Sequence, residues 1–296
     1  MDQPPTDSLN FPIRAAFYYP WYPQAWNQSG FDPYTSFKPQ SGFYSSDDRL
    51  LVRDQIQSMQ YANIQAGIIS WWGIGHYTDL RVPMLLEEAG KTGFKWALYI
   101  ENEGYQNPSE EDIVRDIQYI RQNYANQKEY LHVDGKFVIF VYGSISEDCS
   151  LTQRWMNANP GDAYIVLKIF PGYRRCSTQP DAWHEYAPAV DQRQVGQDSY
   201  SISPGFSKLD DPHTILLRNL GKWQQSVRNM VASGAHFQLV TTFNEWGEGT
   251  AVENAVQWES STQYGSYLDA LHWNGWIPSP AWVDPDSKPF VQTAAK

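Results

Sequence analysis

Short apolar runs alternate along this chain with stretches in which apolar residues recur at helical spacing. Runs bounded by turn residues are typical of buried strands, and the recurring stretches predict amphipathic helices. We expect strands at 14–19, 66–72, 94–100, 136–142, 163–170 and 190–195, and a seventh that runs into the segment 240–250. Such alternation indicates a parallel sheet, because parallel strands need crossover connections that are usually helical.

Cap and turn residues lie between these runs. Asp47 and Asp48 can cap the first helix, and Asp134-Gly135 predicts a hairpin turn before the strand at 136–142. Further helices are expected at 80–89, 109–120, 151–156 and 214–232. The pattern therefore supplies a helix for most of the expected strand connections.

The number of strand–helix units favours one architecture. With at least seven strands, we expect an α/β fold of the eight-stranded (β/α)8 TIM-type barrel class, as a single domain over 13–296 behind an N-terminal linker or arm at 1–12. The eighth strand would lie near 270–276. An open doubly wound sheet is the rival, but the sequence contains neither the GxGxxG turn nor the P-loop that such a sheet should carry.

Charge and cysteine content narrow the setting. The chain has 33 acidic and 22 basic residues, a formal charge of −11, which disfavours nucleic acid and anionic membranes as partners. No apolar run approaches the roughly 20 residues of a membrane span. We expect a disulfide between Cys149 and Cys176, which lie in polar, loop-like sequence, and hence a secreted or periplasmic protein whose polar start follows a removed leader, with Met1 added for expression.

The segment 240–250, VTTFNEWGEGT, carries the strongest chemical signal. A β-branched run ends there in two carboxylates, Glu245 and Glu248, among apolar, aromatic and glycine residues. The nearest basic residues in the sequence are Arg228 before and Lys288 after them, so solvated acids balanced by neighbouring bases are disfavoured. Two carboxylates with separated pKa values are the equipment of a glycosidase.

The carboxyl ends of the other strands add acids and aromatic rings. In a barrel these ends meet at the active site, and aromatic faces stack on sugar rings. Only one residue of each pair Tyr18/Tyr19 and Trp71/Trp72 can face the lumen, since side chains alternate along a strand. Glu101, Tyr142 and the loop residue His76 complete the candidates. Glu103 fits an exposed loop acid better than a functional one. The six histidines show no HxH or HExxH spacing, so we expect no metal and no cofactor.

Taken together, these segments resemble glycoside hydrolase family 99, the endo-α-mannosidase and endo-α-mannanase family, and its looser relatives found beside polysaccharide gene clusters. The matching segments are FYYPWY at 17–22, ISWWG at 69–73 with Asp79, ALYIE at 97–101, FVY at 140–142, and FNEWGEGT at 243–250 with Glu253. They extend in the right order over most of the chain.

The resemblance implies a (β/α)8 barrel that cleaves glycans internally, with retention and without a metal. It implies that Glu245 assists the sugar 2-hydroxyl in attacking its own anomeric carbon, which gives a 1,2-anhydro sugar, and that Glu248 acts as general acid and then base. It also implies that Glu101 binds the reacting sugar. The further substrate-binding residues that we expect are Tyr19, Trp72, Tyr142, Tyr200, Asn244, Trp246, Tyr18 and His76.

Two departures from the family pattern leave the sugar open. Gly247 stands where many members have His, and the strand end at Tyr142 lacks the His that often follows. We therefore expect a retaining endo-acting hydrolase of an α-linked oligo- or polysaccharide, with mannan-like polymers favoured. The alternatives are a glycosidase of another sugar that works by direct displacement or inversion, and a non-catalytic carbohydrate-binding barrel of a glycan-assembly system.

Overall fold

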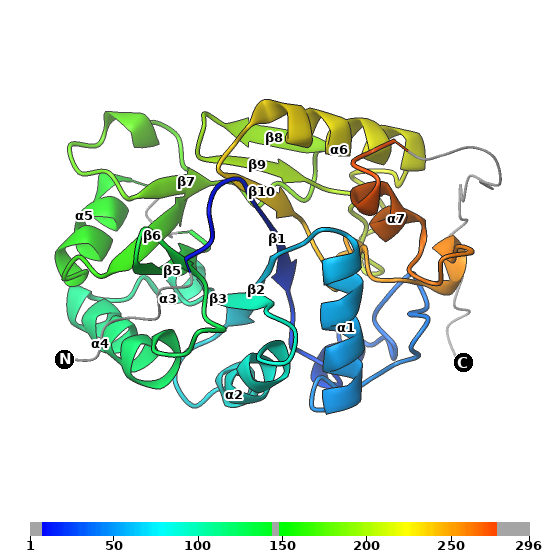
Figure 1. The fold of residues 1–296 in the computed structure, drawn as a ribbon, viewed down its shortest axis with the longest axis horizontal. Coiled ribbons are helices and arrows are strands. Elements are labelled where there is room, and N and C mark those ends of the chain that lie inside the picture. Colours follow the sequence, from blue (N-terminus) through cyan, green and yellow to red (C-terminus); the bar gives the residue numbers. More distant parts are fainter. Residues whose placement is uncertain (1–7, 144–147, 277–296) are drawn as a thin grey trace.

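A computed structural model describes residues 8–143 and 148–276 and shows a barrel of parallel strands wrapped by helices (Figure 1). Hydrogen-bonded neighbours follow the order β7-β6-β5-β3-β2-β1-β10-β9, and each neighbouring pair in this series is parallel. The parallel strands are β1 (Ile13–Tyr18), β2 (Ala66–Trp71), β3 (Lys95–Ile100), β5 (Lys136–Val141), β6 (Ala163–Lys168), β7 (Ala182–His184), β9 (Ser199–Ile202) and β10 (Phe237–Val240). The expected (β/α)8 TIM-type class is confirmed.

Side-chain and backbone contacts join β7 to β9, where no strand ladder closes the barrel among the described residues. The Trp183 N–H donates to Asp198 Oδ2 at 3.2 Å, and the Ser201 hydroxyl donates to the Glu185 carbonyl. β8 (Gln192–Val195) pairs antiparallel with β9, and β4 (His132–Val133) pairs antiparallel with β5. Asp134 and Gly135 both have positive φ between β4 and β5, as the predicted hairpin turn requires.

One strand prediction was wrong, and a second was right as a strand but wrong in its place. The segment near 270–276 contains the end of helix α7 (Ser266–His272) instead of a strand, and the run at 190–195 forms the edge strand β8 rather than a barrel strand. The barrel strands that were missed are β7, with only three residues, and β9, whose sequence SYSI is half polar. Neither produces a recognisable apolar run.

Helices cover the outside of the barrel, and the first of them begins at the cap predicted from Asp48. Asp48 accepts the N–H groups of Leu50 and Leu51 at the start of α1, and Ser109 forms a capping box at α4. The helices are α1 (Arg49–Tyr61), α2 (Tyr77–Ala89), α3 (Glu103–Gln106), α4 (Glu110–Ile120), α5 (Cys149–Ala158), α6 (Leu220–Ser233) and α7, with short helical turns at Gln24–Trp26, Arg121–Ala125, Tyr173–Arg175 and Val256–Trp258. The helix expected at 214–232 starts only at Leu220, because Asn219 caps it.

Alternating strand residues build two apolar layers. On β1, Ala15, Phe17 and Tyr19 belong to the layer that fills the barrel, whereas Ala16 and Tyr18 belong to the layer between barrel and helices. This alternation follows from the two-residue period of a strand. It decides which strand-end side chains can face a ligand.

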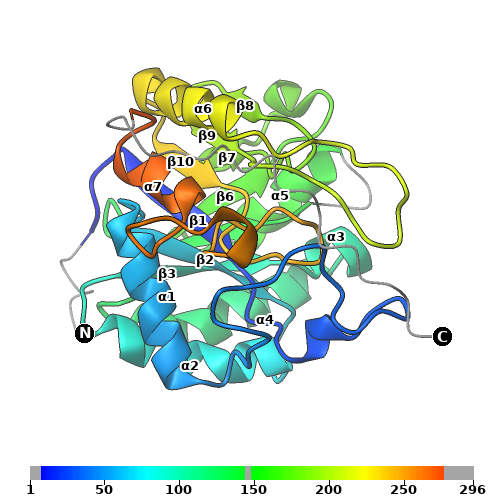
Figure 2. The same ribbon diagram turned by 90° about the vertical axis from the view of Figure 1, so that its right-hand side faces the viewer.

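Loops that follow the carboxyl ends of the strands gather on one side of the barrel. Figure 2 shows α3, the segment 19–48 in blue and the segment 203–219 in yellow-green on this side. Catalytic and binding groups of such barrels lie at this end. The fold therefore brings the predicted strand-end residues to one face.

The expected arm at 1–12 lies partly outside the described residues, as does 277–296 at the end of the expected domain. Within the described part, the Leu9 N–H donates to the His132 carbonyl at 3.0 Å, and the Gly135 N–H donates to Ser8 Oγ at 3.2 Å. Residues 8–12 thus pack against the barrel, and the domain boundaries stay a prediction.

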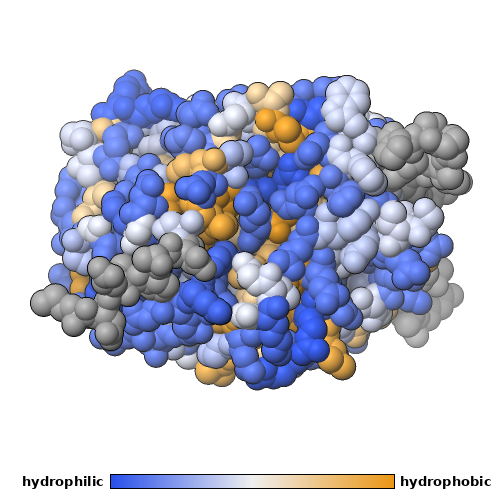
Figure 3. All heavy atoms as spheres, viewed as in Figure 1, coloured by the Kyte–Doolittle hydropathy of each residue, from blue (hydrophilic) through white to orange (hydrophobic). Residues whose placement is uncertain are grey.

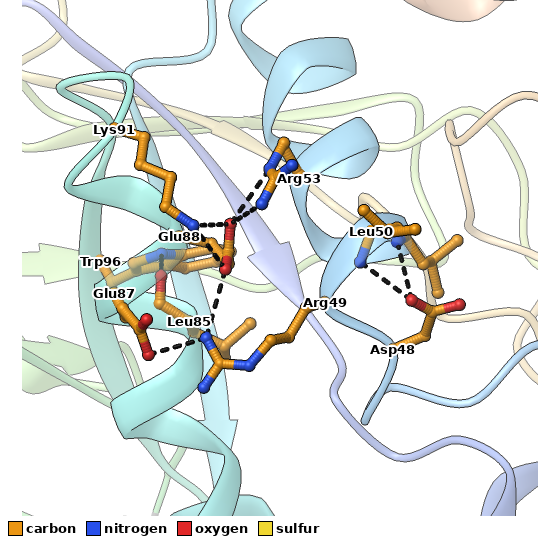
Figure 4. A network of polar contacts seen from close by, with 10 residues as sticks. Asp48, Arg49, Leu50, Arg53, Leu85, Glu87, Glu88, Lys91 and Trp96 are labelled. Atoms are coloured by element: carbon orange, nitrogen blue, oxygen red, sulfur yellow. Dashed lines mark hydrogen bonds and ion pairs between the residues drawn. The ribbon is translucent and has the colours of Figure 1, made fainter.

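Ion pairs around a buried carboxylate join α1 to α2 (Figure 4). Glu88 lies within 3.3 Å of Lys91, Arg53 and Arg49, and the Lys91 and Arg53 hydrogen bonds lower the pKa of Glu88 to about 2.

Hydrophilic side chains cover most of the face seen in Figure 3. Within 8–143 and 148–276, every helix is too short or too polar to cross a membrane.

Candidate active site

The loop after β10 holds both motif carboxylates on a rigid backbone. The Glu245 N–H donates to Thr242 Oγ1 at 2.8 Å, the Thr250 N–H donates to the Glu245 carbonyl at 3.3 Å, and the two threonine hydroxyls lie 3.0 Å apart. The turn therefore closes on itself around Glu245. Side chains held in this way need little reorganisation during a reaction.

A buried guanidinium supports this turn from behind. Arg218 donates to the carbonyls of Gly249 and Ala251 at 2.8 Å each. Its guanidinium lies 4.0 Å from the ring centroid of Trp258 and 4.2 Å from that of Tyr267. Arg218 comes from the loop before α6. The motif thus has a basic contact in the fold, although no basic residue lies near it in the sequence.

Glu245 and Glu248 differ in their surroundings. The Glu248 N–H donates to Glu245 Oε2 at 3.2 Å. Burial, and then the charge of Glu248, raise the pKa of Glu245, while backbone hydrogen bonds and Lys208 act in the opposite direction. Glu248 is more exposed: its Oε1 lies 3.3 Å from Lys208 Nζ, and its Oε2 accepts the Tyr186 hydroxyl at 3.1 Å. Glu245 thus retains a proton to higher pH than an ordinary carboxyl does. Glu248 instead forms an ion pair with Lys208.

Glu101, at the end of β3, is the third carboxyl of the site. Burial raises its pKa to about 8, a hydrogen bond with Ser70 lowers it, and the charge of Glu248 raises it. Glu101 Oε1 is buried and has no hydrogen-bond partner among the described residues. A buried polar atom without a partner is costly, so it is well suited to a ligand hydroxyl.

Two tyrosines connect strand ends to Glu248. The Tyr19 hydroxyl donates to the Tyr186 hydroxyl at 3.0 Å, and Tyr186 donates to Glu248. Tyr19 was predicted from the sequence, but Tyr186 and Lys208 were not. The signal for Tyr186 was the segment WHEY at 183–186, another strand end with an acid and aromatic rings, hidden because β7 is so short.

Aromatic rings form a line past these carboxyls. Ring centroids are 6.1 Å apart for Trp21 and Trp72, 5.1 Å for Trp72 and Tyr105, and 6.0 Å for Tyr105 and Tyr142. A cavity of about 250 Å³ lies at one end and is lined by Trp21, Trp72 and His76. A second cavity, of about 450 Å³, lies at the other end and is lined by Tyr142, Tyr186 and Glu248. The structure thus places Trp72 and His76 at the first cavity and Tyr142 at the second, while Tyr19 is buried with its ring against Trp21.

Four residues predicted to bind substrate have their polar groups engaged elsewhere. Tyr18 packs outside the barrel and donates to Gln55 at 2.6 Å, and Tyr200 lies in the same outer layer and donates to Gln192 at 2.8 Å. Their sheet positions point them away from the lumen. Asn244 hydrogen-bonds both backbone groups of Tyr19, and the indole N–H of Trp246 donates to Tyr44 and Glu253. All four positions correct the expectation of direct sugar contacts.

Tyr34 occupies the space next to Gly247. A β-carbon at position 247 would lie 2.9 Å from the Tyr34 ring and 3.2 Å from Glu245 Oε1. The Tyr34 hydroxyl donates to Asp210 Oδ1 at 2.5 Å, so it links two loops over the site. The missing side chain at 247 is therefore replaced by a ring from the β1–α1 loop.

The other acid and the cysteines have structural positions. Glu103 is buried, accepts the Trp155 indole N–H at 2.8 Å and pairs with Arg154, so it is a structural acid rather than an exposed one. Cys149 and Cys176 form a disulfide with a Cα–Cα distance of 5.3 Å, as predicted. It ties the start of α5 to the loop after β6.

Comparisons with solved structures give the fold. The chain is similar to the GH99 endo-α-mannosidase from Bacteroides thetaiotaomicron, with a TM-score of 0.69 and 21% identity over 90% of this chain and 96% of that one. A structure named "Glycoside hydrolase-like protein" has a TM-score of 0.65 and 17% identity over 90% of this chain and 94% of that one.

Comparisons of sequence give the family. The chain is 24% identical to glycoprotein endo-α-1,2-mannosidase of Rattus norvegicus over 84% of this chain and 62% of the relative. It is 22% identical to the human glycoprotein endo-α-1,2-mannosidase-like protein over 84% of this chain and 64% of that protein. The chain thus spans less than two thirds of the length of these relatives. A profile of glycosyl hydrolase family 99 matches residues 12–165, more than half of the chain, and the chain therefore belongs to glycosyl hydrolase family 99.

Proposed function

We propose that this protein is a retaining, endo-acting glycoside hydrolase of an α-linked glycan. The observation that carries the proposal is the pair Glu245 and Glu248, of which one is buried with a raised pKa and the other is partly exposed beside Lys208. Two neighbouring carboxyls in unlike environments can supply an acid and a base at the same pH.

In the proposed first step, Glu245 takes the proton of the sugar 2-hydroxyl while that oxygen attacks the anomeric carbon. The glycosidic bond breaks, and Glu248 gives its proton to the leaving oxygen, so a 1,2-anhydro sugar forms. Water then opens this ring: Glu248 takes a proton from the water, and Glu245 returns one to the 2-oxygen. The neighbouring hydroxyl is already positioned, so the protein need only move protons.

The first step requires a proton to move from Glu245 to Glu248 before the sugar reacts. In the free protein burial keeps it on Glu245, whereas the step needs it on Glu248. We propose that a bound sugar brings its glycosidic oxygen to Glu248 and its 2-hydroxyl to Glu245, which favours the proton on Glu248. The hydroxyls of Tyr19 and Tyr186 hold Glu248 in place, and the free Oε1 of Glu101 accepts a sugar hydroxyl.

Cavities at both ends of the aromatic line support internal cleavage. Rings at Trp72 and His76 are suited to sugars on one side, and rings at Tyr142 and Tyr186 to sugars on the other. We propose an α-mannoside as the first substrate to test, because the relatives named above are endo-α-mannosidases. The disulfide supports export to an oxidising compartment, secreted or periplasmic.

A panel of α-linked polysaccharides, with α-mannans first, tests the proposal by analysis of released oligosaccharides. We expect a series of oligosaccharide lengths early in the reaction, since an exo-acting enzyme would release single sugars. Glu245→Gln should lower turnover at least 100-fold, in the range of general acid–base groups, and Glu259→Gln, an exposed acid after the motif, serves as the matched control. Binding of a glycan without cleavage by the unaltered protein would favour a carbohydrate-binding barrel instead.

A further inference from the structure

The cavity of about 450 Å³ beside Glu248 differs from the rest of the site in its charge. Its lining includes Lys168 from the end of β6 and Arg193 from β8, together with Glu185. Lys208, which contacts Glu248, adds a third basic group next to it. The protein as a whole carries a formal charge of −11, so three basic side chains around one cavity stand out from the average surface.

The acids of the cavity do not neutralise these bases. Lys168 Nζ lies 3.7 Å from Glu185 Oε1, an ion pair longer than a hydrogen bond, and 5.7 Å from the ring centroid of Tyr142. Lys208 is matched by Glu248. Arg193 is exposed and forms no ion pair with any residue in the described part of the chain. The cavity therefore has one more positive than negative charge, and Arg193 is the group left over.

Neighbouring groups define what such a site can accept. Tyr142 and Tyr186 offer ring faces, and Phe206 with Pro188 adds apolar wall. A volume of about 450 Å³ falls within the range of small-molecule sites. Rings for stacking next to the guanidinium of Arg193 fit a sugar that carries a carboxylate, sulfate or phosphate, since a guanidinium binds such planar or tetrahedral anions well.

We propose that this cavity is a subsite for an anionic sugar unit, held by Arg193 and Lys168. The inference rests on the proposed hydrolase function only in its position: the subsite lies on the Glu248 side, which receives the leaving part of the glycan. The substrate class would then be an α-linked glycan with acidic units rather than a neutral mannan.

Matched ligand pairs test the charge alone. An α-1,2-linked manno-oligosaccharide is compared with the same oligosaccharide oxidised to the carboxylate at C6, and with its 6-sulfate and 6-phosphate. An α-1,4-galacturonan oligosaccharide is compared with its carboxyl-reduced, neutral form. Calorimetry gives the affinities, with Glu245→Gln as the background so that cleavage of the ligands is slow during the measurement.

We expect the charged member of at least one pair to bind about fivefold or more tightly, as for an ion pair at a partly exposed site. Arg193→Gln and Lys168→Gln should each reduce this preference to less than about twofold. The control Lys128→Gln, which removes an exposed cation that does not line the cavity, should retain the preference for the charged ligand. The three anions differ in geometry, so their order of affinity identifies the preferred group.

Equal affinity within every pair, a lack of binding by all ligands, or a preference that survives Arg193→Gln would overturn the subsite. Cleavage of neutral oligosaccharides together with equal affinities would contradict the subsite and leave the hydrolase function standing. Tight, Arg193-dependent binding without cleavage by the unaltered protein would support the subsite and contradict the hydrolase function.

Discussion

Glu253 provides a stability test that does not depend on knowing the substrate. Its carboxyl is buried behind the motif, where Tyr44 donates to Oε2 at 2.6 Å and Gln55 donates to Oε1 at 2.7 Å. Burial raises the pKa of Glu253 from 4.5 to about 7, although these hydrogen bonds lower it. The folded protein therefore binds this proton more tightly than the unfolded chain does.

The sign and size of the effect follow from that difference. Below about pH 4.5 the carboxyl of Glu253 is protonated in both the folded and the unfolded state, so its raised pKa does not reduce the free energy of unfolding. Between about pH 4.5 and 7 the unfolded chain loses the proton first, so the free energy of unfolding falls as pH rises. A separation of about 2.5 pKa units corresponds to about 3 kcal/mol, reached above pH 7.

Glu253→Gln should remove this penalty because an amide keeps the shape and stays neutral. Its oxygen can accept from Tyr44, and its amide can donate to Gln55 once that side chain rotates. Urea unfolding at pH 5, 6, 7 and 8 is the assay. We expect the variant to be more stable than the unaltered protein by about 3 kcal/mol at pH 8 and similar to it at pH 5.

The control is Glu259→Gln, which removes an exposed carboxyl six residues further along. Its unfolding free energy should follow that of the unaltered protein at every pH. Parallel pH profiles for Glu253→Gln and the unaltered protein would show that Glu253 is ionised in the folded state, and would refute the reasoning.

Three further predictions concern the turn, the disulfide and the α1–α2 ion pairs. Gly247→Ala should lower turnover at least tenfold with little loss of stability, because its β-carbon would displace the Tyr34 ring; normal turnover would show that the ring moves freely. Intact mass should reveal no free thiols at Cys149 and Cys176, and replacing both with Ser should cost about 3 kcal/mol of stability; free thiols in oxidised protein would contradict this. Glu88→Gln should lower the free energy of unfolding by about 1–3 kcal/mol at pH 7. Since the pKa of Glu88 lies near 2, this loss of stability should shrink as pH falls from about 4.5 toward 2. A loss of stability that is constant with pH would contradict the ion-pair account.

The fold was predictable where local signals are strong. Apolar runs such as 66–72 and 136–142 became β2 and β5, and the Asp134-Gly135 turn lies where its composition predicts. The short strand β7 and the half-polar β9 were missed because their stability comes from neighbours in the barrel rather than from their own sequence. Such tertiary support leaves no periodic pattern to recognise.

The site was predictable at strand ends and less so across loops. Carboxylates that follow strands must meet at one end of a barrel, so the grouping of Glu101, Glu245 and Glu248 follows from topology. The direction of Tyr18 and Tyr200 depended on strand register, which sequence did not resolve. Lys208 and Tyr34 enter from long loops, whose paths depend on tertiary contacts.

The most direct test of the acid–base pair compares two leaving groups. An α-manno-oligosaccharide needs a proton on its leaving oxygen, whereas the matching glycosyl fluoride needs much less help. We predict that Glu248→Gln loses at least 100-fold of turnover on the oligosaccharide, whereas its first turnover on the fluoride, measured as the initial release of fluoride ion, keeps most of its rate; Glu245→Gln stays slow in both. Near-normal turnover of the oligosaccharide by either variant, or a first release of fluoride that Glu248→Gln slows as much as it slows oligosaccharide cleavage, would contradict the roles assigned to Glu245 and Glu248.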